Sequence, residues 1–328
     1  MTALAASKEK ARTAATEGLI EVRLASISYL ADQVTLLEFQ PLDGQCLPDY
    51  ASGAHLDLHL PNGMTRQYSL ATPFSGESYV IGVKRDPASR GGSTFIHDHL
   101  RVGHQLSISS PRNHFPLHSG REHAVLFAGG IGITPIWCMI SELETAGRSW
   151  ELHYAVRERR DVAFARKLAA AGLRARIYLS GDGPPVLDMS SVIDVAPPGS
   201  HFYCCGPEPM LVAFKSACSG IPVANVHFEH FSATVVASQD TGFKIIAKRT
   251  GKEVIVPPGG TILEALNAAG VETASSCKQG VCGACETVVI DGTPDHRDVI
   301  LSDAEKASNK TMMICCSGAK SPSLVLDI

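Results

Sequence analysis

The stretch CKQGVCGACETVV, residues 277–289, contains three of the chain's ten cysteines. Cys277, Cys282 and Cys285 follow a C-x4-C-x2-C spacing, and a further cysteine stands at Cys315. A loop that offers thiolates from several directions at this spacing is typical of a plant-type [2Fe–2S] cluster. The stretch therefore predicts an iron–sulfur domain near the carboxyl end of the chain.

Two glycines and one alternative bear on this prediction. Gly280 and Gly283 let the backbone come close to a cluster and adopt unusual φ angles, so that amide N–H groups can point at its sulfurs. A structural zinc site is the alternative, but such sites usually pair two short cysteine knuckles and this stretch has only one. We therefore predict a [2Fe–2S] cluster. The residues alone leave the fourth thiolate open between Cys315 and its neighbour Cys316.

The composition is that of an ordinary globular protein with two or three domains. The chain has 328 residues and a net charge of −4, so it lacks the basic surface that nucleic acids or anionic membranes attract. Residues 1–17 have no continuous apolar core and indicate a tail rather than an export signal. The most apolar run, residues 123–137, is too short to span a bilayer. We expect a soluble, cytoplasmic protein whose cysteines are thiols or metal ligands.

Three segments of the chain differ in their patterns. Residues 18–117 alternate apolar and polar residues in short runs between turn residues, the pattern of an antiparallel sheet or barrel. Over residues 121–231, apolar runs such as AVLFAG alternate with helical runs such as WCMISELETAG, which indicates βαβ units and a doubly wound parallel sheet. A polar linker is predicted at 232–241, and residues 242–328 carry the cysteine stretch.

The last segment is predicted to mix strands and helices. It begins with two short strand candidates, FKIIAKRTG and KEVIVPPGG. A capping box from Thr261 to Glu264 starts a helix that Gly270 is placed to end. Ser302 and Glu305 repeat the capping signature for another short helix.

A flavin is expected because the cluster accepts single electrons whereas a nicotinamide donates a hydride, so a converter must stand between them. MTRQYSL supplies Arg66, Tyr68 and Ser69 in an R-x-Y-S pattern. Arg66 is suited to add positive charge at a flavin phosphate and Tyr68 to lie against the isoalloxazine face. Ser69 is suited to hydrogen-bond near N5, where the hydride arrives. Alone, this pattern is more often an ordinary strand surface.

A second motif strengthens the flavin prediction. VKRDPASRGGSTFIHDHL carries Lys84 and then Gly91, Gly92 and Ser93 directly before a helical run. Exposed N–H groups and the positive end of a helix form an anion site suited to a flavin phosphate. The compact motif agrees with FMN, although no residue rules out the adenine extension of FAD.

Two motifs of the middle segment predict a nucleotide site. GGIGITP, residues 129–135, lies between an apolar strand and a helix, where Gly130 and Gly132 would let a pyrophosphate approach backbone amides. The G-x-G-x-x-G fingerprint is absent, and Gly-rich turns of this kind also occur without ligands. The second motif, YCCGPEPM, supplies three further candidates: Cys205, Gly206 and Pro207.

These motifs resemble those of the ferredoxin–NADP reductase superfamily. The cysteine stretch, with MMICCSGAKSPSLVLDI after it, resembles the C-terminal ferredoxin domain of the phthalate dioxygenase reductase family. The resemblance covers nearly everything after the tail. It implies a flavin-binding antiparallel β-barrel over 18–117, an α/β doubly wound nucleotide-binding domain over 121–231 and an α+β β-grasp ferredoxin domain over 242–328. It also implies FMN and NADH beside the [2Fe–2S] cluster.

The resemblance also implies roles for single residues. The fourth cluster ligand would be Cys315, because the family's ligand directly follows a short hydrophobic strand containing methionine. Cys316 stands where the family has a small apolar residue. Thr134 would approach the pyrophosphate, Cys205 would lie beside the nicotinamide, and Phe231 would cover the flavin ring.

The choice between NADH and NADPH depends on contacts to the ribose 2′ position. Arg157, Arg159 and Arg160 in AVRERRD could meet a 2′-phosphate. Asp182 in SGDG is placed where an acid could accept a 2′-hydroxyl and repel a phosphate. Arginine runs on loops are usually solvated, and the family uses NADH. We therefore expect NADH.

The destination of the electrons lies outside this chain, because the sequence has no Rieske pattern of its own. The order flavin, nucleotide, ferredoxin resembles reductases that serve Rieske-type oxygenases and demethylases. It implies a path from NADH to FMN, to the cluster and then to a separate oxygenase, with Ser69, Cys205 and Phe231 as the catalytic set. We expect a monomer. Two alternatives are a stand-alone NADH-dependent electron-transfer flavoprotein or oxidase, and a redox-sensing nucleotide-binding protein.

Overall fold

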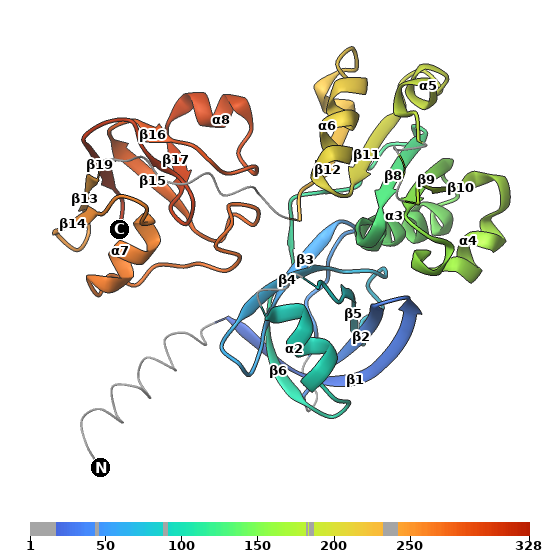
Figure 1. Cartoon of the computed structure of the whole chain (residues 1–328), viewed down its shortest axis with the longest axis horizontal. Coiled ribbons are helices and arrows are strands. Elements are labelled where there is room, and N and C mark those ends of the chain that lie inside the picture. Colours follow the sequence, from blue (N-terminus) through green and yellow to red (C-terminus); the bar gives the residue numbers. More distant parts are fainter. Residues whose placement is uncertain (1–17, 43–45, 88–90, 182, 184–186, 232–241) are drawn as a thin grey trace. The chain divides into compact units, whose positions relative to one another are not determined.

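The computed structural model describes residues 18–42, 46–87, 91–181, 183, 187–231 and 242–328. These form two compact units, Met1–Glu229 and His230–Ile328. The predicted tail at 1–17 and linker at 232–241 lie outside the described residues. The first unit holds two different sheets, and the second holds the cysteine stretch. In Figure 1 the second unit is coloured orange to red.

The first sheet of unit 1 is antiparallel and follows the order β4-β3-β6-β1-β2-β5, with β7 paired to β3. A bridge between Leu70, just after β4, and Ile81 of β5 joins the two ends of this path, so the sheet closes as a barrel. Helix α2 (Gly92–His99) lies between β5 and β6 in the chain. The strands are β1 (Leu19–Ala31), β2 (Val34–Pro41), β3 (Ala54–His59), β4 (Thr65–Ser69), β5 (Tyr79–Lys84), β6 (Gln105–Ser109) and β7 (Arg112–Asn113).

The second sheet of unit 1 is parallel, in the order β10-β9-β8-β11-β12. With β8 as its first strand in the chain, this is the order of a doubly wound nucleotide-binding sheet. The strands are β8 (Ala124–Gly129), β9 (Trp150–Val156), β10 (Ala175–Leu179), β11 (His201–Cys205) and β12 (Val226–Glu229). The α-helices are α3 (Ile133–Thr145), α4 (Ala165–Ala171), α5 (Met189–Asp194) and α6 (Glu208–Ala217).

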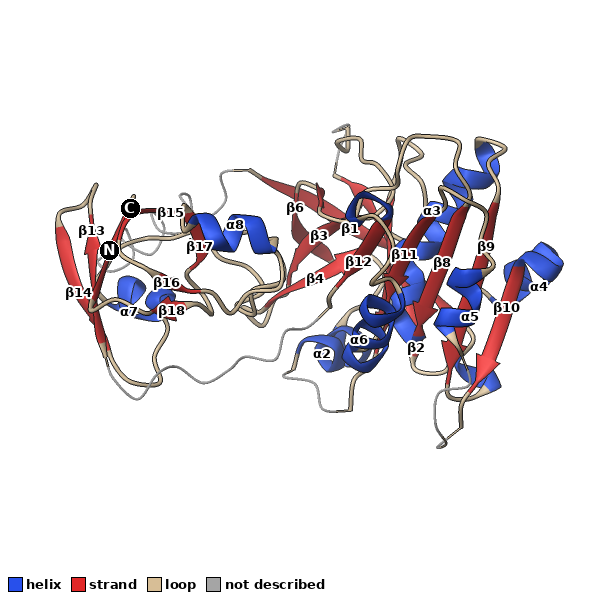
Figure 2. Cartoon of the chain, turned by 90° about the horizontal axis from the view of Figure 1, so that it is seen from above, coloured by secondary structure: helices blue, strands red, loops and turns tan. Residues whose placement is uncertain are grey.

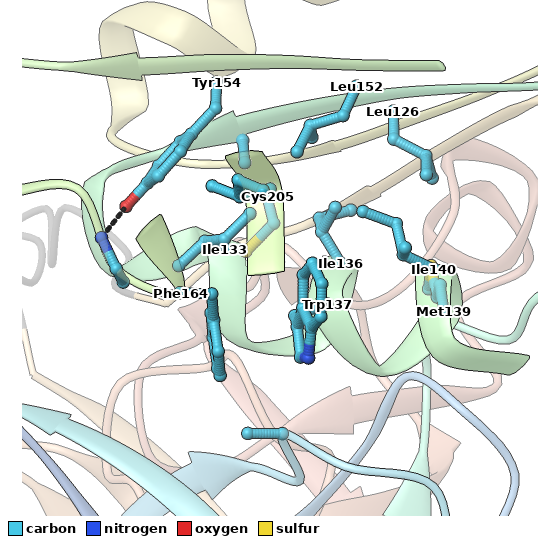
Figure 3. Packing of buried hydrophobic residues seen from close by; sticks show 14 of the residues in the cluster. Leu126, Ile133, Ile136, Trp137, Met139, Ile140, Leu152, Tyr154, Phe164 and Cys205 are labelled. Carbon is cyan, nitrogen blue, oxygen red and sulfur yellow. Dashed lines mark hydrogen bonds between the residues drawn. The ribbon is translucent and has the colours of Figure 1, made fainter. Parts of the chain in front are cut away.

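Helices cover both faces of the parallel sheet. Side chains alternate along β8, so Leu126 and Ala128 pack in a core cluster with α3, while Val125 and Phe127 pack with α5 and α6 on the other face. Figure 2 shows the strands as red arrows among the helices in blue. Figure 3 shows the first cluster, in which Trp137 of α3 stacks on Phe164 with ring centroids 4.9 Å apart. The sequence patterns did not predict helix α5 or strand β12.

Unit 2 contains a mixed sheet in the order β14-β13-β19-β15-β17 and a small pair, β16 with β18. Both predicted capping boxes are present: Thr261 starts α7 and Ser302 starts α8. Gly270, two residues beyond α7, has a φ of +69°. The elements are β13 (Phe243–Ala247), β14 (Lys252–Val256), α7 (Ile262–Ala268), β15 (Glu286–Asp291), β16 (Pro294–Asp295), α8 (Asp303–Ser308), β17 (Thr311–Met313), β18 (Gly318–Ala319) and β19 (Ser323–Leu326).

Candidate functional site

The two predicted flavin motifs lie against each other. Arg66 is on β4 and Gly92 opens helix α2, and a β-carbon at Gly92 would lie only 2.5 Å from Nε of Arg66. Gly91, the residue before the helix, has a φ of +98°, a conformation that favours glycine. The guanidinium is thus held beside the helix N-terminus, and both carry positive charge that suits a phosphate.

The helix N-terminus has no side chain of its own as a cap. Gly91 is the N-cap residue and offers no side-chain hydrogen bond. The Ser93 hydroxyl accepts a hydrogen bond from the Asp86 amide at 3.1 Å, which ties the preceding turn to the helix. Lys84 ends β5 with its side chain exposed. Backbone N–H groups at an uncapped helix start are donors for an anion.

A carboxylate joins the two residues predicted to surround the reacting atoms. The Ser69 hydroxyl donates to Oε2 of Glu229 at 3.3 Å, and the Cys205 thiol lies 4.0 Å from the same oxygen. Ser69 ends β4 in the barrel, whereas Cys205 and Glu229 end the neighbouring parallel strands β11 and β12. The structure therefore brings Ser69 and Cys205 to one place and adds Glu229, which the sequence analysis missed. The catalytic roles of Ser69 and Cys205 stay predictions.

Burial disfavours the charged forms of Glu229 and of the ionisable groups that it contacts. Burial raises the pKa of Glu229 to about 8, partly opposed by the hydrogen bond from Ser69. Burial, with Arg112 and His114 contributing, lowers the pKa of His55 to about 4. The 3.8 Å approach of His55 Nδ1 to Glu229 Oε1 is therefore a contact between uncharged groups rather than an ion pair. Burial likewise raises the pKa of the Cys205 thiol well above its ordinary value.

The two nucleotide motifs pack backbone to backbone at the carboxyl ends of β8 and β11. A β-carbon at Gly132 would lie 2.2 Å from the carbonyl oxygen of Cys205, and one at Gly129 would lie 3.1 Å from Cα of Gly206. Gly129 and Gly206 also both face the Met210 sulfur. These approaches leave no room for side chains, so the motifs G-G-x-G and C-G-P-x-x-M, with Pro207 beginning α6 as its N-cap, form one structure.

The other residues of the GGIGITP motif have different surroundings. Gly130 has a φ of +53° and open space where a β-carbon would point, and its carbonyl accepts a hydrogen bond from the Tyr154 hydroxyl at 3.0 Å. Thr134 is buried, with its methyl group against Gly82 of the barrel and its hydroxyl donating to the Ile131 carbonyl at 3.0 Å. Thr134 thus packs the parallel sheet's first helix onto the barrel. Its approach to a pyrophosphate stays a prediction.

The residues predicted to choose the nucleotide are only partly described. Asp182 lies outside the described residues. Arg160 pairs with Glu158 at 3.0 Å and with Asp32 of the barrel at 3.6 Å, while its side chain stays 64% exposed. Phe231 is 39% exposed and falls in the second unit, so its predicted place over a flavin stays a prediction.

The cysteine loop of unit 2 gathers its thiols. The Cys277 thiol makes hydrogen-bonding contacts with the thiols of Cys282 and Cys315. Cys282, Cys285 and Cys315 are buried, and Cys277 is half-buried. The backbone turns through left-handed conformations at Lys278, Gly280 and Gly283, with φ of +55°, +71° and +73°.

Amide groups of this loop point at its sulfurs. The Gln279 amide donates to Cys277 Sγ at 3.3 Å and the Ala284 amide to Cys282 Sγ at 3.4 Å. Contacts of the Cys277 thiol with those of Cys282 and Cys315, together with these amide donors, let several thiolates surround one bound group. The residues present therefore fit a [2Fe–2S] cluster.

Cys316 is a second buried thiol next to Cys315. Its thiol contacts that of Cys315. It also faces Gly280, where a β-carbon would lie 2.5 Å from Cys316 Sγ. The Cys277 thiol contacts Cys315, which favours Cys315 as the fourth ligand, and this assignment remains a prediction.

Comparison with known proteins places these features in a family. Residues 245–320 match the 2Fe-2S iron–sulfur cluster binding domain family. Phenoxybenzoate dioxygenase subunit beta of Ectopseudomonas oleovorans is 48% identical over 316 residues, 96% of this chain and 99% of that one. Tetrachlorobenzoquinone reductase of Sphingobium chlorophenolicum is 48% identical over 319 residues, 94% of this chain and 98% of that one.

One solved structure decides the family. It is titled phthalate dioxygenase reductase, a modular structure for electron transfer from pyridine nucleotides to [2Fe–2S]. It matches with 36% identity and a TM-score of 0.75, covering 96% of this chain and 99% of that one. The chain belongs to the phthalate dioxygenase reductase family. Membership in the phthalate dioxygenase reductase family confirms the predicted fold class and the predicted oxidoreductase class. In the described residues, no helix is long and apolar enough to cross a membrane.

Proposed function

We propose that this chain is the reductase component of a Rieske-type oxygenase or demethylase system. It takes electrons from NADH and passes them through FMN and its [2Fe–2S] cluster to a separate oxygenase. Membership in the phthalate dioxygenase reductase family supports this cofactor set. The observation that carries the proposal is the convergence of Ser69, Cys205 and Glu229 in a chain that also holds the cysteine loop.

The flavin phosphate would be held by Arg66 and the N-terminus of α2. When bound, FMN supplies the conversion of a two-electron hydride into single electrons. The compact Gly91–Gly92 turn and the adjacent guanidinium match a terminal phosphate, which carries about two negative charges. Arg66→Ala is therefore expected to lose FMN on gel filtration, measured as the ratio of released flavin to protein.

The group around Glu229 would receive the reacting ends of flavin and nicotinamide. Ser69, Cys205 and protonated Glu229 surround this place with polar but uncharged groups. Exclusion of water from such a place protects a hydride in transfer from side reactions. Ser69 positions a hydroxyl there, and the packing of Gly132 on Cys205 fixes the thiol's backbone.

NADH is the proposed donor rather than NADPH. Arg160 already pairs with Glu158 and Asp32, so its charge is balanced without a 2′-phosphate. We expect kcat/KM for NADH to exceed that for NADPH by more than about tenfold, a difference of about 1.4 kcal/mol. Equal values for the two nucleotides would contradict this choice. Steady-state reduction of ferricyanide provides the measurement.

The test of the whole path is anaerobic addition of NADH to the purified holoprotein. Bleaching of the flavin absorbance followed by a rhombic [2Fe–2S] signal in low-temperature EPR is expected. Flavin bleaching without that signal would separate the flavin site from the cluster and overturn the proposed path. Cys282→Ser provides the matched comparison, because it should keep the bleaching and abolish the signal.

The partner and surroundings of the protein complete the proposal. The named relatives include a dioxygenase subunit, which supports a separate oxygenase as the electron acceptor. We propose that the protein is a monomer in the cytoplasm. Sedimentation equilibrium of the holoprotein checks the first point, and cell fractionation checks the second. A stable dimer or a membrane-bound fraction would contradict them.

A second candidate is direct reduction of a small quinone. The observation that favours it is the 48% identity to a protein named tetrachlorobenzoquinone reductase. Quinone-dependent NADH oxidation without any protein partner would support this function. Cys282→Ser then shows the route: unchanged quinone reduction indicates electrons leaving from the flavin, and lost reduction indicates electrons leaving from the cluster.

A further inference from the structure

We propose that His118, Glu122 and His201 form a binding site for a divalent transition metal such as Zn²⁺. One ligand atom from each of the three side chains lies within 4.8 Å of the other two. The site is at the amino end of the parallel sheet, because His201 is the first residue of β11 and Glu122 stands two residues before Ala124, the first residue of β8. Two imidazoles and one carboxylate are ligands that zinc accepts in proteins.

The contacts of the three side chains favour shared binding. Nε2 of His118 lies 3.4 Å from Oε2 of Glu122. Nδ1 of His201 lies 3.0 Å from Nε2 of His227 on the neighbouring strand β12. A metal-binding histidine usually has its second ring nitrogen held by another group, which fixes the ring's orientation. His227 would hold His201 in this way and leave Nε2 of His201 for the metal.

Two of the neighbouring imidazoles, His201 and His227, lie where burial disfavours the charged form of the ring. Burial, with the neighbouring His118 contributing, lowers the pKa of His201, although Glu122 opposes this. Burial, with His201 contributing, lowers the pKa of His227 to about 4. Arg148 also acts on His201 and Glu122, and its positive charge opposes a cation there.

The site combines a fixed ligand with two adjustable ones. His201 is 8% exposed, whereas the side chains of His118 and Glu122 are 39% and 46% exposed. The rings of His118 and His201 are stacked, 3.9 Å between centroids and 8° between planes. A metal lies in the plane of each imidazole that binds it, so the exposed His118 ring must tilt away from this stack when the metal binds. Solvent can reach the metal's remaining positions.

Binding would join two parts of unit 1 that are distant in the sequence. His118 and Glu122 belong to the segment that leads from the barrel into the parallel sheet, whose His118 amide also donates to the Tyr203 hydroxyl at 2.9 Å. His201 begins the strand that ends at Cys205. A metal here would therefore stabilise this connection at the end of β11 opposite the thiol, and we expect it to leave flavin reduction by NADH unchanged.

The experiment uses the holoprotein, freed of loose metal with EDTA, incubated with one equivalent of Zn²⁺ and passed through gel filtration. Zinc per protein is measured by mass spectrometry, and the ligands by X-ray absorption at the zinc edge. We expect close to one zinc with nitrogen and oxygen neighbours at about 2.0–2.1 Å, whereas thiolate binding would give sulfur at about 2.3 Å.

Two variants decide between this site and unspecific binding. His118→Ala with Glu122→Gln removes two exposed ligands and should lower zinc retention at least tenfold. His123→Ala is the matched control, because His123 lies at the same end of the sheet and its ring contacts Ser149 and Glu151. Its carbonyl, which accepts a hydrogen bond from the His201 amide, is unchanged by the substitution. It should retain zinc like the wild type.

Three results would overturn the proposal. They are sulfur neighbours in the absorption spectrum, equal zinc retention in the double variant and the wild type, or no retained zinc in a wild-type protein whose flavin and cluster are intact. Thermal unfolding of the double variant without zinc, compared with the wild type, shows that the substitutions have not simply unfolded the domain.

Discussion

The Glu229 group and the cysteine loop are both places where electrons would pass, yet they are built in different ways. Three of the loop's cysteines stand within one short stretch, and amides of the same stretch point at their sulfurs. The Glu229 group joins the end of a barrel strand to the ends of two parallel strands. The cysteine site, called the local site below, therefore draws most of its ligands from one segment and only Cys315 from beyond it, whereas the Glu229 group depends on the packing of two sheets. The two should therefore fail independently.

The largest expected effect concerns the fourth ligand of the local site. Cys315→Ala should abolish the [2Fe–2S] EPR signal and reduce protein-bound iron to background, because the cluster loses a thiolate. Flavin reduction by NADH should persist, since it belongs to the other region. Iron analysis and EPR of the anaerobically reduced protein provide the measurement.

Cys316→Ala is the matched control for this substitution. It changes the neighbouring buried thiol, which contacts Cys315 and Gly280, and should keep iron and signal close to the wild type. If Cys316→Ala lost the cluster and Cys315→Ala kept it, the ligand assignment would be reversed.

The next effect tests the packing on which the Glu229 group depends. Gly132→Ala places a methyl group 2.2 Å from the Cys205 carbonyl oxygen. Overpacking of this kind costs roughly 1–3 kcal/mol of unfolding free energy, and contact with backbone rather than a flexible side chain favours the upper end. Urea unfolding of the holoprotein, followed by flavin fluorescence, measures the change.

Gly130→Ala separates packing from nucleotide binding at the same turn. Gly130 has a φ of +53° with open space beyond it, so alanine should cost only about 1 kcal/mol of backbone strain. Its effect should appear in KM for NADH if a pyrophosphate lies against this turn. An unfolding free energy lowered as much as in Gly132→Ala would contradict the packing argument.

A smaller effect is expected from Ser69→Ala, which removes the hydroxyl that donates a hydrogen bond to Glu229 at 3.3 Å. One neutral hydrogen bond contributes about 1 kcal/mol, so anaerobic flavin reduction by NADH should slow about fivefold to tenfold. Stopped-flow absorbance measures this rate. A wild-type rate in Ser69→Ala, with FMN fully bound, would remove Ser69 from the catalytic set. Ser69→Thr keeps a hydroxyl and should recover part of the rate.

The last expected effect depends on pH and concerns Glu229 alone. Its pKa is about 8 in the folded protein against an ordinary 4.5. The folded state therefore holds this proton more tightly than the unfolded state, so stability falls as pH rises from about 4.5 to about 8 and then levels off. Glu229→Gln removes this loss. Its stability gain over wild type should be absent near the low end of this window and largest above it, at no more than about 1.4 kcal/mol per pH unit.

Melting temperatures of the two holoproteins at about pH 6, 7.5 and 9 test the sign of this effect. Glu253→Gln, on the exposed surface of unit 2, is the control that should show no such trend. If the stability gain of Glu229→Gln over the wild type shrank as pH rose, Glu229 would be ionised in the folded protein.

The comparison also explains what the sequence could predict. The cluster cysteines and the two glycine motifs are local patterns, in which spacing alone fixes which atoms can meet. Within the cysteine stretch, the Cys277 thiol contacts that of Cys282. The packing of Gly132 on Cys205 joins two motifs that are far apart in the sequence, and the spacing within either motif did not predict it. Cys315 came from the family resemblance, because a cysteine so far along the chain has no spacing rule to identify it.

Other residues carried no local signal. Glu229 stands in HFEHF, a run without a recognisable pattern, and its meaning appears only when β12 pairs with β11 beside the barrel. Helix α5 is six residues long, too short for a helical repeat to show. A search for strands of alternating or continuous apolar residues would also have missed β12, whose four residues include His227 and Glu229.

The burial of Thr134 against Gly82 affects how the protein unfolds on heating. This contact couples the first helix of the parallel sheet to barrel strand β5 within one compact unit, whereas the ferredoxin unit has its own separate core. Barrel and parallel sheet should therefore melt together in a single cooperative transition, and the ferredoxin unit in another. Calorimetry would then resolve two peaks for a chain with three cofactor-binding segments, and loss of iron would move only one of them.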